Sequence, residues 1–211
     1  MLSELLYELE SIGDNCEFGI VQRHHGVEPL GLLRWAGLKL HMLLNALDDE
    51  FAALGRPENL QLRQLNTEYL VRDTGYGIHY HPFVHVDRMT PEALIEREVV
   101  RIGFLRDKFL ADLRDARKIL VFKQENNMTE AQARDLLRRL AAYGPNKLLY
   151  VVATDDPRLR GTVDLLDDGL ARGYVARFGD YGNLPEHICF DDWADICLQA
   201  DTRLFAAPAR S

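Results

Sequence analysis

Cysteine is scarce in this chain, and the few cysteines are not arranged as a disulfide framework or a metal site. The 211 residues include three cysteines, Cys16, Cys189 and Cys197, and no C-x-x-C pair. An odd number of widely spaced cysteines favours free thiols in a reducing compartment. The lack of paired cysteines argues against a cysteine zinc site and against a dithiol redox motif.

The chain also lacks long apolar runs and an excess of positive charge. No apolar stretch approaches the roughly 20 residues that a membrane span requires, and the first residues have neither the basic nor the apolar region of a signal peptide. The formal net charge of −8 opposes general nucleic-acid binding, which needs a basic face. We therefore expect a cytoplasmic protein with no membrane span and no general nucleic-acid binding.

Several motifs that are diagnostic of nucleotide binding or of serine hydrolases are missing as well. The sequence contains no P-loop, no G-x-G-x-x-G and no G-x-S-x-G. The nucleotide-binding and serine-hydrolase interpretations therefore lose their usual support. We expect no cofactor, and we assign no metal ligand from these patterns.

The residues that are present predict one α/β domain over 1–205, followed by a disordered tail at 206–211. Apolar runs at 118–122 and 147–153 flank a helix that begins at Thr129 with Gln132 in its first turn. Strand, helix and strand with short joints indicate a right-handed parallel crossover. We therefore expect a three-layer domain with a mostly parallel sheet flanked by helices. Further expected elements are a helix from Asp14 to about residue 24, a helix at 35–47, one or two strands within 60–71, an extended segment at 78–86, a helix from Thr90-Pro91, a strand at 174–178 and a helix at 191–200.

The segment Ser11-Ile12-Gly13-Asp14-Asn15-Cys16-Glu17-Phe18-Gly19 carries the most chemical interest. If Asp14 caps the following helix, Cys16 lies in the first turn. Free backbone amides and the helix dipole there favour an anion, so we expect a lowered thiol pKa. Such a thiolate is a nucleophile, and the same amides can hold an oxyanion. The alternative is that Cys16 is a small buried apolar residue.

A histidine group follows at His79-x-His81-x-x-x-His85, with Asp87 two residues later. A cysteine nucleophile needs a base, usually a histidine oriented by a third polar group, so His85 with Asp87 is a candidate. The three histidines are also candidates for a zinc or iron site. A solvated edge strand, which Pro82 favours, explains them equally well.

The segment around Cys16, continuing through Leu33-Arg34-Trp35, resembles the opening of an uncharacterised bacterial family described, by prediction, as papain-like cysteine peptidases. The resemblance implies Cys16 as nucleophile, Asn15 as an oxyanion donor and His85 as the later histidine. It also implies an association with glycan-assembly proteins. The family has an acid where this chain has Arg34.

A second resemblance concerns the fold. Strand, Gly13-Asp14-Asn15 and helix are similar to the first block of the lipase/esterase family with a Gly-Asp-Ser start, which has a doubly wound α/β sheet. Asn15 replaces the serine of that family and cannot attack. This resemblance implies the fold and not the serine chemistry.

Together these patterns leave three function hypotheses open. The first is a thiol-dependent hydrolase or acyltransferase with Cys16 as nucleophile and His85 as base. In that hypothesis the substrate-binding candidates are Asp14, Arg34, Trp35 and His81. The second is a non-catalytic binding or accessory module associated with glycan assembly, and the third is a metal-dependent enzyme that uses His79, His81 and His85.

Overall fold

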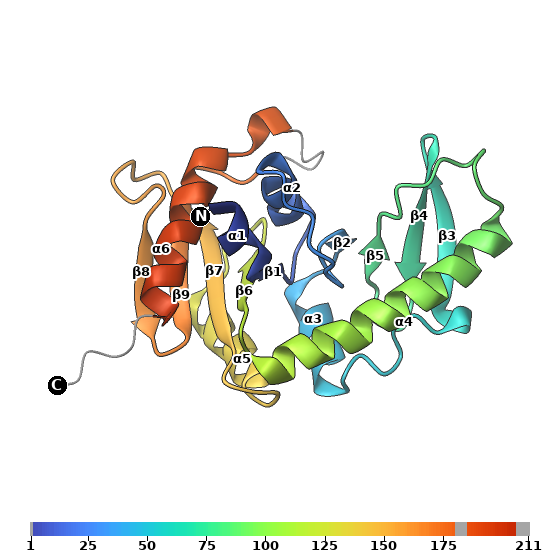
Figure 1. The fold of residues 1–211 in the computed structure, drawn as a ribbon, viewed down its shortest axis with the longest axis horizontal. Helices are drawn as coiled ribbons and strands as arrows, with labels where there is room; N and C mark the ends of the chain where they lie inside the picture. Colours follow the sequence, from blue (N-terminus) through green and yellow to red (C-terminus); the bar gives the residue numbers. More distant parts are fainter. Residues whose placement is uncertain (1, 180–184, 206–211) are drawn as a thin grey trace.

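The computed structural model describes residues 2–179 and 185–205 of the chain, which form two β-sheets and their covering helices (Figure 1). The larger sheet is five-stranded, and its neighbouring strands pair in parallel except for the last pair. The predicted mostly parallel sheet and its crossover are therefore confirmed, whereas the antiparallel edge strand β8 was not predicted. In spatial order the strands are β1 (Leu9–Ser11), β6 (Ile119–Lys123), β7 (Lys147–Ala153), β9 (Leu170–Val175) and β8 (Val163–Asp167).

The smaller sheet is antiparallel, and the sequence did not predict it as a separate unit. Its spatial order is β2 (Ala36–Gly37), β5 (His79–Tyr80), β4 (Glu68–Asp73) and β3 (Leu60–Leu65). The strands β3 and β4 form a hairpin through Asn66 and Thr67, with Asn66 in the left-handed region at φ 54°. Because β2 and β5 are so short, their pairing leaves almost no pattern in the sequence.

Two predicted helix starts are confirmed in atomic detail. The hydroxyl of Thr90 accepts from the amide of Ala93 at the start of α4, and Thr129 and Gln132 form a capping box at the start of α5. The helix expected at 35–47 begins only at Leu40, because the residues before it pair with β5. No helix within the described residues is long and apolar enough to cross a membrane. The helices are α1 (Leu2–Tyr7), α2 (Glu17–His24), α3 (Leu40–Asp48), α4 (Pro91–Asp115), α5 (Glu130–Leu140) and α6 (Phe190–Phe205), with short 3-10 turns η1 (Pro57–Asn59) and η2 (Pro185–His187).

The core holds the two sheets together. Successive side chains of β6 alternate between two hydrophobic clusters: Ile119 packs with residues of α2 and α6, whereas Leu120 packs with residues of α3 and α5. The second cluster also contains Val71 and Tyr80 from the antiparallel sheet. Helix α4 runs from one sheet to the other along this core (Figure 1). The predicted tail at 206–211 lies outside the described residues.

A glycine shapes the connection that leaves β1. Gly13 has φ +147°, and a Cβ on it would lie 2.7 Å from the ring of Phe122 in β6. Only glycine therefore lets this backbone pass so close to the neighbouring strand. The residues that follow, Asp14 to Cys16, are placed at the carboxyl edge of the parallel sheet, where open α/β sheets often bind ligands.

Candidate functional site

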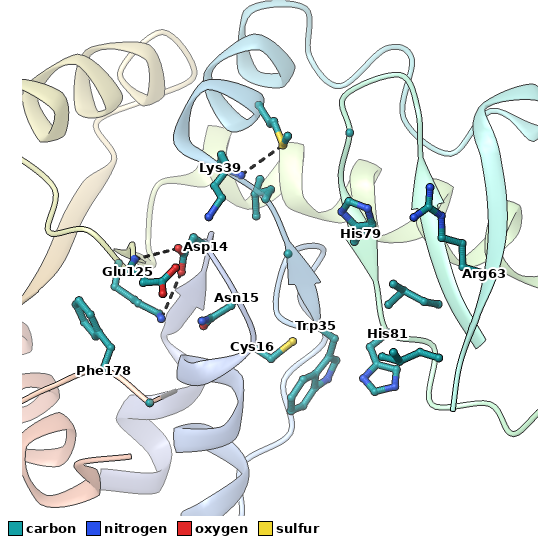
Figure 2. Close-up of a pocket in the computed structure, with 18 residues that line it drawn as sticks. Asp14, Asn15, Cys16, Trp35, Lys39, Arg63, His79, His81, Glu125 and Phe178 are labelled. Atoms are coloured by element: carbon teal, nitrogen blue, oxygen red, sulfur yellow. Dashed lines mark hydrogen bonds and ion pairs between the residues drawn. The ribbon is translucent and has the colours of Figure 1, made fainter. Parts of the chain in front are cut away.

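A cavity of about 570 Å³ lies between the carboxyl edge of the parallel sheet and one face of the antiparallel sheet. Its volume is in the range of small-molecule sites. The loop from Asp14 to Cys16 forms one wall together with the end of β6, and the strands β3 to β5 form the other (Figure 2). Among the side chains that line it are Cys16, Trp35, Lys39, Arg63, His79 and His81.

Cys16 is the N-cap residue of α2, so the helix begins two residues later than expected from a cap at Asp14. The cap was also predicted on the wrong side chain. The amide of Glu17 donates to the side-chain oxygen of Asn15 at 3.0 Å, whereas the carboxylate of Asp14 accepts from the amide of Glu125 at 3.1 Å. The side-chain amide nitrogen of Asn15 is thereby left as a donor, and Asn15 and Cys16 both line the cavity.

The expectation of a lowered thiol pKa was wrong. Burial raises the pKa of Cys16 from its ordinary value of 9.0 to about 11, and the nearby charges of Lys123 and Arg23 offset this rise only in part. Desolvation of the sulfur is the largest cause of the raised pKa. At neutral pH Cys16 is therefore a neutral thiol, and any reaction of its sulfur as a nucleophile would require a base.

His81 lies on the other wall of the same cavity and has its own carboxylate partner. Its Nε2 donates to Oε2 of Glu68 at 2.7 Å. In the neutral ring this leaves Nδ1 as the proton acceptor. Figure 2 shows the Cys16 sulfur directed toward the side of the cavity where Trp35 and His81 lie.

Strand β2 explains how residues so distant in the sequence come to share a cavity. The amide of Leu38 donates to the carbonyl of Asp14 at 2.9 Å, which ties the Cys16 loop to the end of β2. At the other end, the amide of His81 donates to the carbonyl of Trp35 at 3.0 Å. The segment from Trp35 to Leu38 is thus bonded to both walls.

The base candidate named from the sequence lies elsewhere. His85 and Asp87 are not among the residues that line the cavity. The ring of His85 is bound to Asp87 through Nδ1 and Oδ1 at 2.5 Å, and both side chains are largely exposed. The left-handed backbone of Phe83, at φ 54°, interrupts the strand pattern after His81, so the predicted common face of the three histidines ends there.

A buried charge cluster supports the Cys16 wall. The ammonium of Lys123 at the end of β6 lies 3.0 Å from the carboxylate of Glu17 and 3.3 Å from that of Asp14. The indole nitrogen of Trp193 in α6 donates to Glu17 at 3.0 Å. These side chains are almost completely buried. Asp14, which was expected to contact substrate, therefore lines the cavity while paired to Lys123.

Of the two further substrate-binding candidates, Trp35 lines the cavity and Arg34 does not. Arg34 is 2% exposed, does not line the cavity and donates to the carbonyls of Gly19 and Val27. Trp35 does line the cavity, but the guanidinium groups of Arg23 and Arg34 lie 4.3 and 4.6 Å from its ring centroid. The role that we infer for Arg34 is structural, because its donors satisfy buried carbonyl groups.

The residue types for a metal centre are not assembled in the described part of the chain. No group of three or more His, Cys, Asp and Glu side chains there is placed to hold a metal ion. His79 and His81 line the cavity, whereas His85 is bound to Asp87 outside it. The proposed three-histidine ligand set is therefore not formed by these residues.

Several cavity residues were missed from the sequence. Lys123 and Arg63 line the cavity and Glu68 binds His81, but all three belong to strands whose pairing partners were not known, so nothing tied them to Cys16. Lys123 left a signal, because it follows the apolar run 118–122 at the end of a predicted parallel strand, where open α/β sheets bind ligands. Comparison with known proteins finds no family model, no curated protein and no solved structure that matches this chain.

Proposed function

We propose that this protein is a thiol-dependent hydrolase or acyltransferase in which Cys16 is the nucleophile and His81 is the base. One observation carries the proposal: Cys16 and His81 line the same cavity, and His81 is hydrogen-bonded to Glu68. Nucleophile, base and orienting acid are the parts that cysteine-dependent acyl transfer needs. His81 takes the role that was predicted for His85, because His85 does not line the cavity.

The raised pKa of Cys16 decides the order of proton transfer. Since the thiol is neutral, Nδ1 of His81 takes the proton from the sulfur as the sulfur–carbon bond to the acyl carbonyl forms. The imidazolium that results is stabilised by the carboxylate of Glu68. The side-chain amide of Asn15 donates to the carbonyl oxygen as it becomes negative.

The remaining steps restore the enzyme. The imidazolium of His81 gives its proton to the leaving group as the carbon–leaving-group bond breaks, which leaves an acyl thioester on Cys16. Water, or a second acceptor with a hydroxyl or an amine, loses a proton to His81 and attacks the thioester. Cys16 then leaves as the thiol, with the proton that His81 returns. Water gives a hydrolase, and another acceptor gives an acyltransferase.

The experiment is detection of the acyl intermediate. The protein is mixed with a panel of thioesters and aryl esters, quenched in acid and mapped by mass spectrometry. We expect one acyl group on Cys16, none on the variant Cys16→Ser, and far less on His81→Ala. Cys189→Ser and His85→Ala are matched controls that keep the adduct, because Cys189 and His85 do not line the cavity. An adduct that forms equally on Cys189, or that survives in His81→Ala at full rate, contradicts the proposal.

The raised pKa of Cys16 also favours a second candidate function, a non-catalytic binding module. In that case the same cavity holds a ligand without covalent chemistry. The two functions separate cleanly, because a binding module retains its ligand affinity in Cys16→Ser and forms no thioester with any member of the panel.

Other expectations from the sequence accompany this proposal. A three-layer arrangement of the α/β domain is favoured by the two clusters that receive alternate side chains of β6. A cytoplasmic location, the resemblance to papain-like cysteine peptidases and an association with glycan-assembly proteins stay predictions. Cross-linking in cells followed by identification of the captured proteins tests the predicted association.

A further inference from the structure

One face of the antiparallel sheet gathers positive charge beside the cavity. In the strand register Arg72 of β4 lies opposite His79 of β5 and Gln61 of β3. Arg63 is two residues beyond Gln61, so its side chain is on the same face. The other face carries Val71 and Tyr80, which are buried in the core. The face that turns away from the core therefore presents Arg63, Arg72 and His79 together.

These arginines have no acidic partner. Within the described residues Arg63 makes no ion pair or side-chain hydrogen bond, and Nε of Arg72 is buried without a hydrogen-bond partner. Arg97 and Arg101 on α4 differ, because both are paired with the carboxylate of Glu98. A buried donor that lacks a partner is costly and calls for an explanation.

The carboxylate of Glu68 on this face does not neutralise the charges of Arg63 and Arg72. Glu68 is held by Nε2 of His81 at 2.7 Å. The cations also act on one another, since burial, Arg72 and Arg63 together lower the pKa of His79. From the other side of the cavity Lys39 adds a further ammonium that has no ion pair among the described residues. Arg63, His79 and Lys39 thus line the cavity, and Arg72 lies opposite His79 on the same face of the sheet without lining the cavity itself.

We propose that Arg63, Arg72 and His79 form a binding subsite for a phosphate group of the substrate. Guanidinium groups bind phosphate through paired hydrogen bonds, and a phosphate dianion can accept from several donors at once. His79 donates from a ring nitrogen and becomes protonated once the anion is present. Figure 2 shows Arg63 and His79 on the wall that faces the Cys16 loop.

The subsite narrows the substrate class. A ligand whose phosphate lies against Arg63 and His79 still has the rest of the cavity of about 570 Å³ for the part that reaches Cys16. The inferred substrate is therefore an acyl compound that carries a phosphate group. This statement of substrate class rests on the proposed function, whereas phosphate binding itself does not.

The experiment measures phosphate binding without thiol chemistry. On a Cys16→Ser background, inorganic phosphate is titrated at neutral pH and low salt while the ring resonances of His79 are followed by NMR. We expect saturable shifts and a raised pKa of His79 in the bound form. Arg63→Gln and Arg72→Gln should each weaken binding about tenfold or more, since each removes charge-assisted hydrogen bonds. Concentrated KCl should weaken binding as well.

The control is Arg160→Gln, which changes an arginine in the β7–β8 connection that does not line the cavity. It should leave the phosphate affinity within twofold. The proposal is overturned if phosphate does not shift His79, if Arg160→Gln weakens binding as much as Arg63→Gln, or if succinate binds as tightly as phosphate. Arg63 is exposed, so its variant tests the subsite even if Arg72→Gln does not fold. Failure of the acyl-adduct experiment leaves this binding result unchanged.

Discussion

Replacing Lys123 with methionine tests how the Cys16 wall is held. Lys123 is 1% exposed, and its ammonium is the cation between the carboxylates of Glu17 and Asp14. Methionine fills most of the volume of the lysine side chain but leaves the two buried carboxylates without a cation. Breaking a buried ion pair from one side costs about 3–5 kcal/mol. We expect a loss of that size in the free energy of unfolding, against a total of about 5–15 kcal/mol for a typical protein.

Urea denaturation followed by circular dichroism measures this loss, and a double-mutant cycle assigns it. Glu17→Gln removes one of the stranded charges while its amide oxygen can still accept from Trp193. The double variant Lys123→Met, Glu17→Gln should therefore be more stable than Lys123→Met alone. Lys39→Met, at an exposed lysine with no ion pair among the described residues, should change the stability by less than about 0.5 kcal/mol.

Lys123→Met also has a chemical readout, the pH dependence of Cys16 alkylation, that would not change if the lysine were purely structural. The positive charge of Lys123 lowers the pKa of Cys16 and partly offsets the effect of burial. In Lys123→Met the alkylation of Cys16 should therefore shift to higher pH. A loss of stability below about 1 kcal/mol, with an unchanged pH profile of alkylation, would refute the reasoning about this charge cluster.

Three other predictions follow from single observations. Because the pKa of Cys16 is about 11, about 10⁻⁴ of the molecules hold the thiolate at pH 7, and the rate of alkylation by iodoacetamide should climb tenfold per pH unit up to that value; a plateau below pH 9 would contradict this. Gly13→Ala should cost about 2–4 kcal/mol in urea denaturation, since its Cβ meets the ring of Phe122 at a positive φ; a neutral effect would show that the loop is not held there. Arg34→Lys should cost about 2–4 kcal/mol by the same measurement, because an ammonium cannot replace the guanidinium contacts with Glu28 and the buried carbonyls; full stability would mean that these contacts are dispensable.

The sequence was informative wherever a local rule decides the structure. The capped starts of α4 and α5 and the β6–α5–β7 crossover were predicted, because caps, apolar runs and short joints are properties of neighbouring residues. One or two strands within 60–71 were also predicted, but the hairpin that β3 and β4 form was not. The crossover accounts for the parallel pairing of β6 with β7, whereas the place of the Cys16 loop depends on the pairing of β1 with β6.

The cavity could not be predicted in the same way, because its second wall depends on short pairings between distant residues. Strand β2 has only Ala36 and Gly37, and β5 has only His79 and Tyr80. Neither is long enough to show a period. The choice of His85 over His81 followed from the nearby Asp87, whereas the partner of His81 is Glu68 on another strand.

The pKa of Cys16 differed from expectation for an energetic reason. A helix start favours a thiolate by a modest amount at an exposed site, whereas desolvation of the enclosed sulfur acts in the opposite direction and is the largest cause of the raised pKa. The position of Cys16 in the sequence shows the first effect and not the second. Burial has to be known before the sign of such a shift can be given.

The rate of Cys16 acylation by an aryl ester, measured against pH in the wild-type protein and in His81→Ala, tests the central claim most directly. If His81 removes the thiol proton, the wild-type protein should react about 10²–10⁴ times faster at neutral pH. The two rates should converge near pH 11, where the sulfur ionises without help. Profiles that coincide from neutral to alkaline pH would contradict the pairing of Cys16 with His81.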